Sequence, residues 1–250
     1  MKISVVTPVF NGAGTIGDCL DSVARQTHPD VEHIVIDGGS SDGTPDVVRA
    51  KGARVARFVS EPDRGIYDAM NKGIALASGD VIGILNSDDW YAGGGVLAKV
   101  AAAFAAPVDA VFADLVYVRP EKPGTIVRYY SGKGFSPAQF ASGRMPPHPT
   151  FFLRRECYLK YGGFKTDYRI AADFELLARL MAKNGIRYRY LPEVWVRMRT
   201  GGASTRSLRS NLILNREILR ACAENGIATN VFKVYSKYLA KWTQLLRRPA

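Results

Sequence analysis

Short apolar runs alternate with segments of helical period through the first half of the chain. Residues 3–8 (ISVVTP) and 32–37 (EHIVID) are strand-like. Between them, apolar side chains recur at intervals of three and four: Ile16, Cys19, Leu20, Val23 and Ala24. This spacing places them on one face of a helix. Apolar strands that alternate with helices are typical of a parallel sheet covered on both faces, so the pattern predicts an α/β fold.

The same alternation continues to residue 85. Thr44, Pro45 and Asp46 are the residue types of an N-cap, a first helical position and a first-turn acid, so they predict the start of a second helix. A strand, a helix and another strand are then expected at 54–60, 66–78 and 80–85.

The second half of the chain is less regular. Helical patterns cover 95–106 and 173–185, and two basic helical patterns, separated near 224–230, finish the chain. Strand-like segments fill the rest: 109–118, 125–130, 149–154 and 188–199. We expect an α/β core closed by a mixed sheet in residues 1–205, followed by a basic helical extension in 206–250.

Composition fits an ordinary folded domain, and the charge adds one departure. In 250 residues, 47% hydrophobic and 23% charged residues exclude a disordered or fibrous chain. A formal charge of +11 indicates either an anionic partner or only a soluble basic surface. Three cysteines without metal-like spacing favour a reduced, cytosolic compartment. The sequence has neither the pattern of a secretion signal nor an apolar run of about 18 residues, so we expect no membrane span.

The glycine-rich motif GAGTIG, residues 12–17, matches the G-x-G-x-x-G pattern of dinucleotide-binding folds, with Asp37 as the distal acid. In those folds the first glycine ends the strand itself. Here Pro8 to Asn11 intervene before Gly12. We therefore interpret GAGTIG as a loop and the first turn of a helix.

Acidic residues gather where the predicted parallel strands end. NSDDW, residues 86–90, places Asp88 and Asp89 directly after an apolar strand, and Asp37 ends another. Open α/β sheets bind ligands at this edge. Adjacent carboxylates repel each other unless a cation or ligand hydroxyls accept them, and Mg²⁺ or Mn²⁺ prefers oxygen ligands of this kind. The alternative for NSDDW is a solvated turn or a helix N-cap.

Two further motifs carry candidate binding residues. In IDGGSSDGT, two glycines after Asp37 permit a tight backbone beside a ligand, although a βα turn alone would account for residues 40–44. In EPDRGIYDAMNKG, Arg64 either faces a phosphate group or pairs with Asp63 or Asp68.

These motifs, in this order, resemble the family 2 glycosyltransferases of the GT-A fold, which use nucleotide sugars in polysaccharide assembly. The resemblance covers roughly residues 1–205, through VVTPVFNG, IDGGSSDGT, EPDRGIYDAMNKG, GD, NSDDW, HPTFFLRRECYLKYGGF and AADFELLARL. The sequence is similar to members that build bacterial exopolysaccharide or cell-envelope glycans. The resemblance implies a Rossmann-like, mostly parallel central sheet flanked by helices, with a C-terminal helical extension.

The resemblance also implies a role for each matching residue. One group would contact the donor nucleotide: Pro8, Phe10, Asn11, Asp37, Arg64, Asp68 and Asp88. Within it, Asp37 would contact uracil or guanine, and Asp88 the ribose or the sugar. Asp89 would ligate Mn²⁺ or Mg²⁺ that bridges the diphosphate. The implied donor is a nucleoside diphosphate sugar, with UDP favoured and GDP as the alternative.

The family's catalytic base falls on Asp173 in AADFE. Many relatives have Glu-Asp where this chain has Ala172 and Asp173, so Glu175 stays open as an alternative base. Asp173 could also be only a favourable first-turn acid. Many relatives carry a late His where this chain reads VRMRTGGAST, and His148 before Pro-Thr-Phe is more often structural than a ligand. A third protein ligand to the metal therefore stays unassigned.

The motifs and the resemblance together predict an inverting, metal-dependent glycosyltransferase with a saccharide or lipid-linked acceptor and no nucleic-acid partner. The alternatives are a nucleotide-sugar-binding module without turnover and a membrane-surface scaffold. In 231–248, apolar and basic residues recur at helical spacing around Trp242, which suits an anionic membrane surface. A helix docked on the core or on a partner would give the same pattern. The expected location is cytoplasmic, either free or peripheral at the inner face of the cell membrane.

Overall fold

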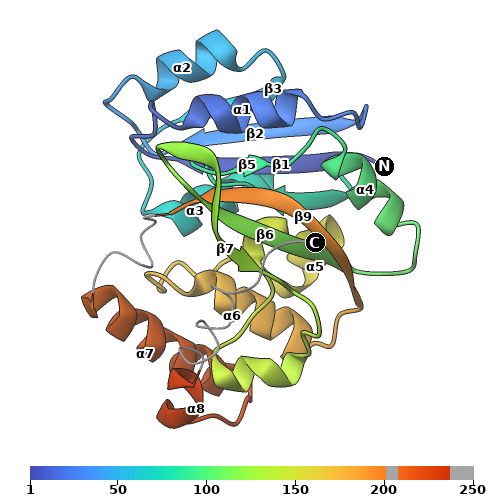
Figure 1. Cartoon of the computed structure of the whole chain (residues 1–250), viewed down its shortest axis with the longest axis vertical. Helices are drawn as coiled ribbons and strands as arrows, with labels where there is room; N and C mark the ends of the chain where they lie inside the picture. Colours follow the sequence, from blue (N-terminus) through green and yellow to red (C-terminus); the bar gives the residue numbers. More distant parts are fainter. Residues whose placement is uncertain (201–207, 237–250) are drawn as a thin grey trace.

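The computed structural model describes residues 1–200 and 208–236. Nine strands lie in these residues: β1 (Ile3–Val9), β2 (Val31–Asp37), β3 (Val55–Ser60), β4 (Val81–Ile84), β5 (Trp90–Tyr91), β6 (Ala110–Arg119), β7 (Lys122–Tyr130), β8 (Phe152–Arg154) and β9 (Tyr188–Arg199). They form one sheet in the order β3-β2-β1-β4-β8-β6-β9-β5, with β7 paired to β6 (Figure 1).

Helices connect these strands and cover the sheet. The α-helices are α1 (Ile16–Ala24), α2 (Thr44–Lys51), α3 (Ile66–Leu76), α4 (Val96–Ala103), α5 (Arg155–Tyr161), α6 (Ala172–Ala178), α7 (Leu208–Glu224) and α8 (Val231–Tyr235). Two short 3₁₀ segments, η1 (Pro137–Ser142) and η2 (His148–Thr150), and one π-helical segment, η3 (Arg179–Lys183), complete the described elements.

The sheet has a parallel half and a mixed half. β1 pairs in parallel with β2 and β4, and β2 pairs in parallel with β3. β8 is antiparallel to both β4 and β6 and so joins the two halves. β9 runs parallel to β6, whereas β5 and β7 are antiparallel to their partners. The expected α/β core closed by a mixed sheet is confirmed.

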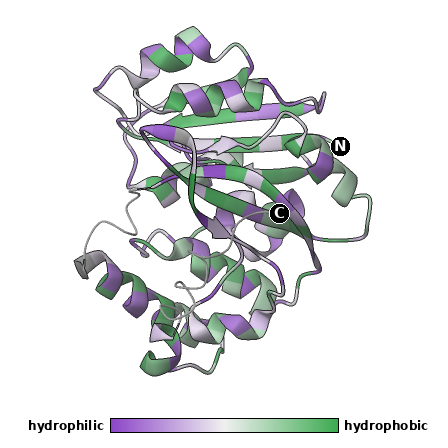
Figure 2. Ribbon diagram, viewed as in Figure 1, coloured by the Kyte–Doolittle hydropathy of each residue, from purple (hydrophilic) through white to green (hydrophobic). Residues whose placement is uncertain are grey.

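Both faces of the sheet are covered by helices. Val5 of β1 belongs to the apolar layer that contains residues of α1 and α4, whereas its neighbour Val6 belongs to the layer of α3 and α6. Successive strand residues face opposite sides, so strands covered on both faces need apolar residues at nearly every position. The resulting apolar bands run through the sheet in Figure 2.

The predicted elements agree closely with the structure, and the strand expected at 188–199 has the bounds of β9. One correction concerns the start of α2, where the N-cap is Gly43, with φ of 89°, rather than Thr44. The Thr44 hydroxyl instead donates to Asp42 Oδ1 at 2.5 Å and accepts from the Gly12 N–H at 2.9 Å. It therefore joins two loops and does not cap its own helix.

Three local features were not anticipated. The chain forms α5 directly after β8, adds the two-residue strand β5, and changes from α-helix to π-helix at Arg179. The two residues of β5 carry no strand pattern of their own. They form a strand because they pair with β9, opposite Val196 and Arg197. The three cysteines are unpaired and buried.

The C-terminal helices that the structure describes pack on the core. Ile218, Ala221 and Cys222 of α7 and Val234 of α8 lie buried in the same apolar layer as α6. Figure 1 shows α7 and α8 beyond α6, away from the parallel strands. The outer side of α8 leaves Phe232 88% exposed. The rest of the predicted tail helix, after residue 236, lies outside the described residues. No helix within the described ranges is both long and apolar enough to cross a membrane.

Candidate active site

Hydrogen bonds join the loops that follow β1 and β2. The Asn11 N–H donates to Ser40 Oγ at 2.7 Å, and Asn11 Oδ1 accepts from the Ser41 N–H at 3.0 Å. Asn11 has a φ of 50°, the one positive value for a non-glycine residue in the described chain. Asn tolerates this left-handed conformation better than most residues. Asn11 therefore fixes the geometry of the predicted nucleotide edge.

Asp37 lies where it was expected, at the carboxyl end of β2. Its carboxylate is fully buried and accepts hydrogen bonds from the Ser40 N–H and hydroxyl, and from Ser60 Oγ at 2.6 Å. The next residue, Gly38, has no room for a side chain, because a Cβ there would lie 2.5 Å from Asp63 Oδ2. The loops after β2 and β3 therefore meet beside Asp37.

The two apolar candidates from the first motif have different surroundings. Pro8 is buried within β1, opposite Ile36 of β2. Phe10 follows the end of that strand and is 65% exposed. An exposed aromatic ring at this edge can stack on a ligand, whereas Pro8 presents no open side-chain surface.

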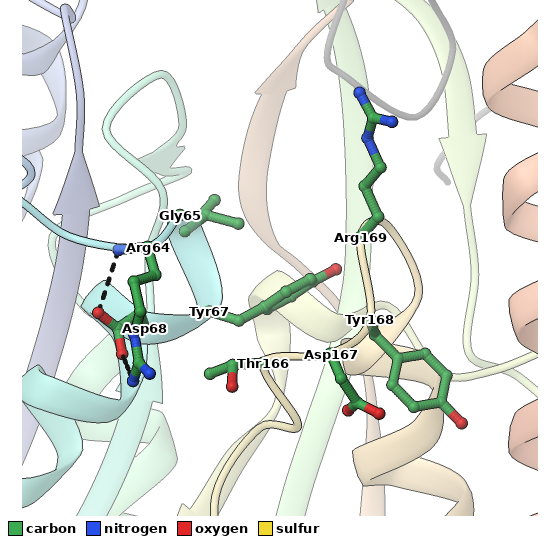
Figure 3. Close-up of a pocket in the computed structure, with 9 residues that line it drawn as sticks. Arg64, Gly65, Tyr67, Asp68, Thr166, Asp167, Tyr168 and Arg169 are labelled. Atoms are coloured by element: carbon green, nitrogen blue, oxygen red, sulfur yellow. Dashed lines mark hydrogen bonds and ion pairs between the residues drawn. The ribbon is translucent and has the colours of Figure 1, made fainter.

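A pocket of about 300 Å³ opens between the start of α3 and a loop before α6, lined by residues 64–68 and 166–169 (Figure 3). At its α3 side, Arg64 Nη2 donates to Asp68 Oδ1 at 2.8 Å, and the Arg64 N–H donates to Asp68 Oδ2 at 3.2 Å. The Arg64 side chain is nevertheless 79% exposed. The pairing of Arg64 with Asp68, one of the two sequence-based alternatives, is present in the structure.

NSDDW forms the turn between β4 and β5. Asp89 is fully buried, while Asp88 is half-buried. Asn86 Nδ2 donates to Asp89 Oδ2 at 3.3 Å, but Asp89 Oδ1 and Asn86 Oδ1 are buried without any hydrogen-bond partner. Burial, and then the charge of Asp88, raise the pKa of Asp89, against smaller lowering effects of Asn86 and Arg199.

These two oxygen atoms fit a hard divalent cation. An unpartnered buried acceptor costs about 1–3 kcal/mol, so it calls for a ligand or a structural reason. A carboxylate and an amide oxygen suit Mg²⁺ or Mn²⁺. Residues 1–200 and 208–236 contain no group of three His, Cys, Asp or Glu side chains that could hold a metal. A cation at Asp89 would therefore need further oxygen atoms from a ligand or water.

Arg199 lies in the VRMRTGGAST segment, where the sequence resemblance left a metal-binding His in doubt. It ends β9, donates from Nη1 to the Asp88 carbonyl at 2.7 Å, and forms an ion pair with Asp18 of α1. Its guanidinium also lies over the Trp90 ring, 4.5 Å from the ring centre. Arg199 thus fastens the NSDDW turn and supplies positive charge beside it, whereas a His could ligate a metal directly.

The structure separates Asp173 from Glu175. Glu175 is fully buried and ion-paired with Arg179 of the next turn and with Lys165, at 3.1 Å each. Asp173 is half-buried, and its one hydrogen bond in the described chain is from the adjacent Phe174 N–H at 2.8 Å. Burial raises the pKa of Asp173 to about 6. Asp173 therefore has no ion pair in the described chain, whereas Glu175 holds two elements of the fold together.

The carboxylates of Asp89 and Asp173 act on one side chain, Tyr117 of β6. Burial raises the pKa of the Tyr117 phenol, Arg128 opposes this, and the charges of Asp89 and Asp173 raise it further. Two acids from distant parts of the sequence therefore influence the same phenol.

A carboxylate of α7 holds the loop that precedes Asp173. Glu217 accepts the backbone N–H groups of Arg169, Ile170 and Ala171 at 2.7, 2.9 and 2.8 Å. On the pocket side, Tyr67 Oη donates to the Ile170 carbonyl at 2.5 Å. The sequence contains no motif around Glu217 that could have indicated this contact.

His148 has a structural environment. It is buried, its ring packs edge-on against Phe164 at 5.5 Å, and burial lowers its pKa to about 4. His148 is therefore a neutral, buried side chain packed against an aromatic ring, which agrees with the structural role that its sequence context favours.

The sheet with its flanking helices has the fold of GT-A glycosyltransferases, as the comparison with solved structures shows. The family model "Glycosyl transferase family 2" matches residues 4–165, and the chain belongs to that family. The GT-A fold and the assignment to family 2 are confirmed, and the protein is a glycosyltransferase.

Named relatives agree with this assignment. A "PGL/p-HBAD biosynthesis glycosyltransferase" of Mycobacterium bovis is 31% identical over 222 residues, which are 87% of this chain and 82% of the relative. S. aureus TarS 1-349 in complex with UDP-GlcNAc has a TM-score of 0.68 at 18% identity, covering 96% of this chain and 72% of that one. This chain covers 43% of another TarS structure. The mannosyltransferase PcManGT from Pyrobaculum calidifontis, in complex with GDP-Man and Mn²⁺, has a TM-score of 0.69 at 22% identity, covering 98% and 72%.

Proposed function

We propose that this glycosyltransferase moves a sugar from a nucleoside diphosphate sugar to an acceptor hydroxyl, with inversion at the anomeric carbon. The observation that carries the proposal is a pair of carboxylates, one in the NSDDW turn and one at the start of α6, that the fold leaves without an ion pair in the described chain. Asp89 has an unpartnered buried oxygen, while Asp173 has a raised pKa and no ion pair in the described chain. Perturbed carboxylates without structural partners are typical of catalytic sites.

The donor is a UDP-sugar by preference, with a GDP-sugar as the alternative. TarS was crystallised with UDP-GlcNAc and PcManGT with GDP-Man and Mn²⁺, and both share the fold of this chain. Asn11 and Asp37 lie at the carboxyl edge where such folds bind nucleotides. Phe10 precedes Asn11, and Asp88 follows β4, the other parallel neighbour of β1. Arg64 and Asp68 would complete the donor contacts from the pocket at the start of α3.

Asp89, assisted by Asn86, would hold Mn²⁺ or Mg²⁺. When bound, such an ion neutralises the charge that develops on the leaving diphosphate. Arg199 fixes the turn that carries Asp88 and Asp89, so it would act by keeping these oxygen atoms in place.

Asp173 would act as the general base. In a single displacement, the acceptor oxygen forms a bond to the anomeric carbon as the bond from that carbon to the diphosphate oxygen breaks. The acceptor proton passes to Asp173, and the bonding electrons leave with the diphosphate. Because the acceptor attacks from the face opposite the leaving group, the configuration inverts. A pKa near 6 leaves Asp173 ionised at neutral pH and still basic enough to take the proton.

The acceptor is a saccharide, preferably lipid-linked, and the protein would meet it in the cytoplasm at the inner face of the membrane. The support is the outer side of α8, where Val231 and Phe232 are exposed and Lys233 lies between this side and the buried Val234. An apolar and basic surface suits an anionic bilayer. Phe232→Ser should reduce co-sedimentation with anionic vesicles, whereas Leu159→Ser, which removes another largely exposed apolar residue from α5, should not. Equal binding of both variants and the wild type would contradict the membrane contact.

A donor screen tests the proposed function. Incubation with UDP- and GDP-sugars in Mn²⁺ or Mg²⁺ should release the nucleoside diphosphate from one donor class, and excess chelator should abolish the release. Asp89→Asn should reduce turnover on the order of 10² or more, because a neutral amide binds the cation poorly. Exposed Asp46→Asn on α2 is the matched control. A protein that binds the donor but never turns it over would instead be the non-catalytic binding module or scaffold.

A further inference from the structure

Three buried side-chain polar atoms in the described residues have no hydrogen-bond partner: Asn86 Oδ1, Asp89 Oδ1 and Arg128 Nε. The first two are acceptors at the proposed metal position. The third is a donor on a permanent cation, and no metal can satisfy it. A buried donor without a partner is costly, so the Nε–H of Arg128 calls for an acceptor, and an anion is the acceptor that suits a cation.

Stacking against aromatic rings holds Arg128 in one orientation. Arg128 belongs to β7 and lies opposite Tyr117 of β6 in the sheet register. Its guanidinium carbon is 4.2 Å from the centre of the Tyr117 ring and 5.7 Å from that of Tyr130. Rings on the faces of a guanidinium leave its N–H edge for other partners, and this edge matches two oxygen atoms of a phosphate group. In the described chain, the buried Nε–H of that edge has no hydrogen-bond partner.

Arg144 adds a second cation on the side of Asp173. Tyr130 Oη donates to the carbonyl of Met145, the residue after Arg144, at 2.6 Å. The preceding segment η1 packs through Phe140 against Phe174, with ring centres 5.3 Å apart, and Phe174 follows Asp173. Burial raises the pKa of Tyr130, the charges of Tyr117 and Asp173 add to this, and the charges of Arg128 and Arg144 oppose it. Arg128 therefore lies against the Tyr130 ring, whose hydroxyl binds the carbonyl of the residue after Arg144.

We propose that Arg128 and Arg144 form a phosphate-binding subsite for the acceptor, so that the protein takes an acceptor carrying a phosphate or diphosphate ester. This inference rests on the proposed function, because it takes Asp173 as the base that meets the acceptor hydroxyl. The same chemistry could serve the donor diphosphate. Tyr130 joins Arg128 to the segment of Arg144, and the preceding η1 contacts the helix of Asp173, whereas Arg199 and Asp18 flank the turn of Asp89. An anionic acceptor beside an ionised Asp173 also needs cations that offset the repulsion.

Calorimetry on the full chain tests the subsite with two probes that differ by one phosphate, glucose 1-phosphate and glucose. Saturating UDP and Mg²⁺ keep the donor position filled. The wild type should bind glucose 1-phosphate more tightly than glucose. Arg128→Gln should raise the Kd for glucose 1-phosphate on the order of tenfold or more, and leave the Kd for UDP unchanged. Arg128→Lys keeps the charge but loses the bidentate contact, so its Kd for glucose 1-phosphate should lie between those of the wild type and Arg128→Gln.

Arg49→Gln is the matched control, since it removes the same charge from the exposed surface of α2. Thermal melting shows whether Arg128→Gln still folds, and Arg144→Gln, on an exposed side chain, provides a second variant. The proposal is overturned if Arg128→Gln and the wild type bind glucose 1-phosphate equally. It is also overturned if only the UDP affinity falls, because Arg128 then serves the donor.

A failure of the proposed function gives a different result. If the wild type binds neither UDP nor GDP, the glycosyltransferase mechanism proposed above fails. Titration of glucose 1-phosphate without nucleotide still decides the subsite in that case: dependence on Arg128 supports it, and independence rejects it.

Discussion

The pH dependence of turnover gives the sharpest test of Asp173 as the base. Burial raises the pKa of Asp173 to about 6. A base must be ionised to accept a proton, so turnover should rise with pH through this range. For a single group with this pKa, about a tenth is ionised at pH 5 and about nine tenths at pH 7. The rate at saturating donor should therefore rise roughly tenfold between these values, and then level off.

Asp173→Asn should abolish this rise with pH and lower turnover by a factor on the order of 10² or more, because the amide keeps the size of the carboxylate but not its basicity. Its stability should not fall. The folded state raises the pKa, so it holds the proton more tightly than the unfolded chain, and ionised Asp173 costs stability above about pH 6. The amide removes that cost. At pH 8 the Tm of the variant should match or exceed that of the wild type.

Glu175→Gln is the matched control, two residues along the same helix and about 200° away. It leaves Arg179 and Lys165 facing a neutral amide in a buried site, and breaking a buried ion pair typically costs about 3–5 kcal/mol. We expect Glu175→Gln to have a lower Tm but the same rise of turnover between pH 5 and 7 as the wild type. Both variants are assayed below their melting transitions by release of nucleoside diphosphate. If Glu175→Gln is the inactive variant and Asp173→Asn turns over normally, or if the wild-type rate is flat from pH 5 to 7, the assignment of the base is wrong.

Two further predictions concern residues that act on the same edge. Asp37→Ala should weaken UDP binding at least tenfold in calorimetry while Asp46→Ala does not, because only Asp37 lies at the end of a parallel strand; unchanged affinity would reject its role. Glu217→Gln should move the rise of turnover with pH to lower pH, because the charge of Glu217 raises the pKa of Asp173. It should also lower the maximal rate, because the loop 169–171 loses the carboxylate that holds it. Glu224→Gln removes a neighbouring α7 carboxylate that does not contact this loop, so a shift in both variants would argue against a specific role of Glu217.

The sequence by itself determined the strands, most helices and the chemistry of one edge. Apolar runs with polar residues at their ends predicted β1, β2 and β4, and parallel strands must present those ends together. Asn11, Asp37 and the NSDDW turn could therefore be assigned to one site before any contact was known. The family could be assigned from the same motifs, because their residues act locally and in a fixed order along the chain.

Tertiary structure alone decided which acid is free and which groups surround it. Helical period places Asp173 and Glu175 on different faces but does not say which face is covered. Glu175 forms ion pairs with Lys165 and Arg179 and accepts a hydrogen bond from Asn225, so Asp173 is the acid of this helix without an ion pair in the described chain. Glu217 reaches its loop from another helix, and Arg128 meets Tyr117 across a hairpin with shifted register. Such contacts depend on how distant elements pack, and side-chain packing leaves no period or motif in the local sequence.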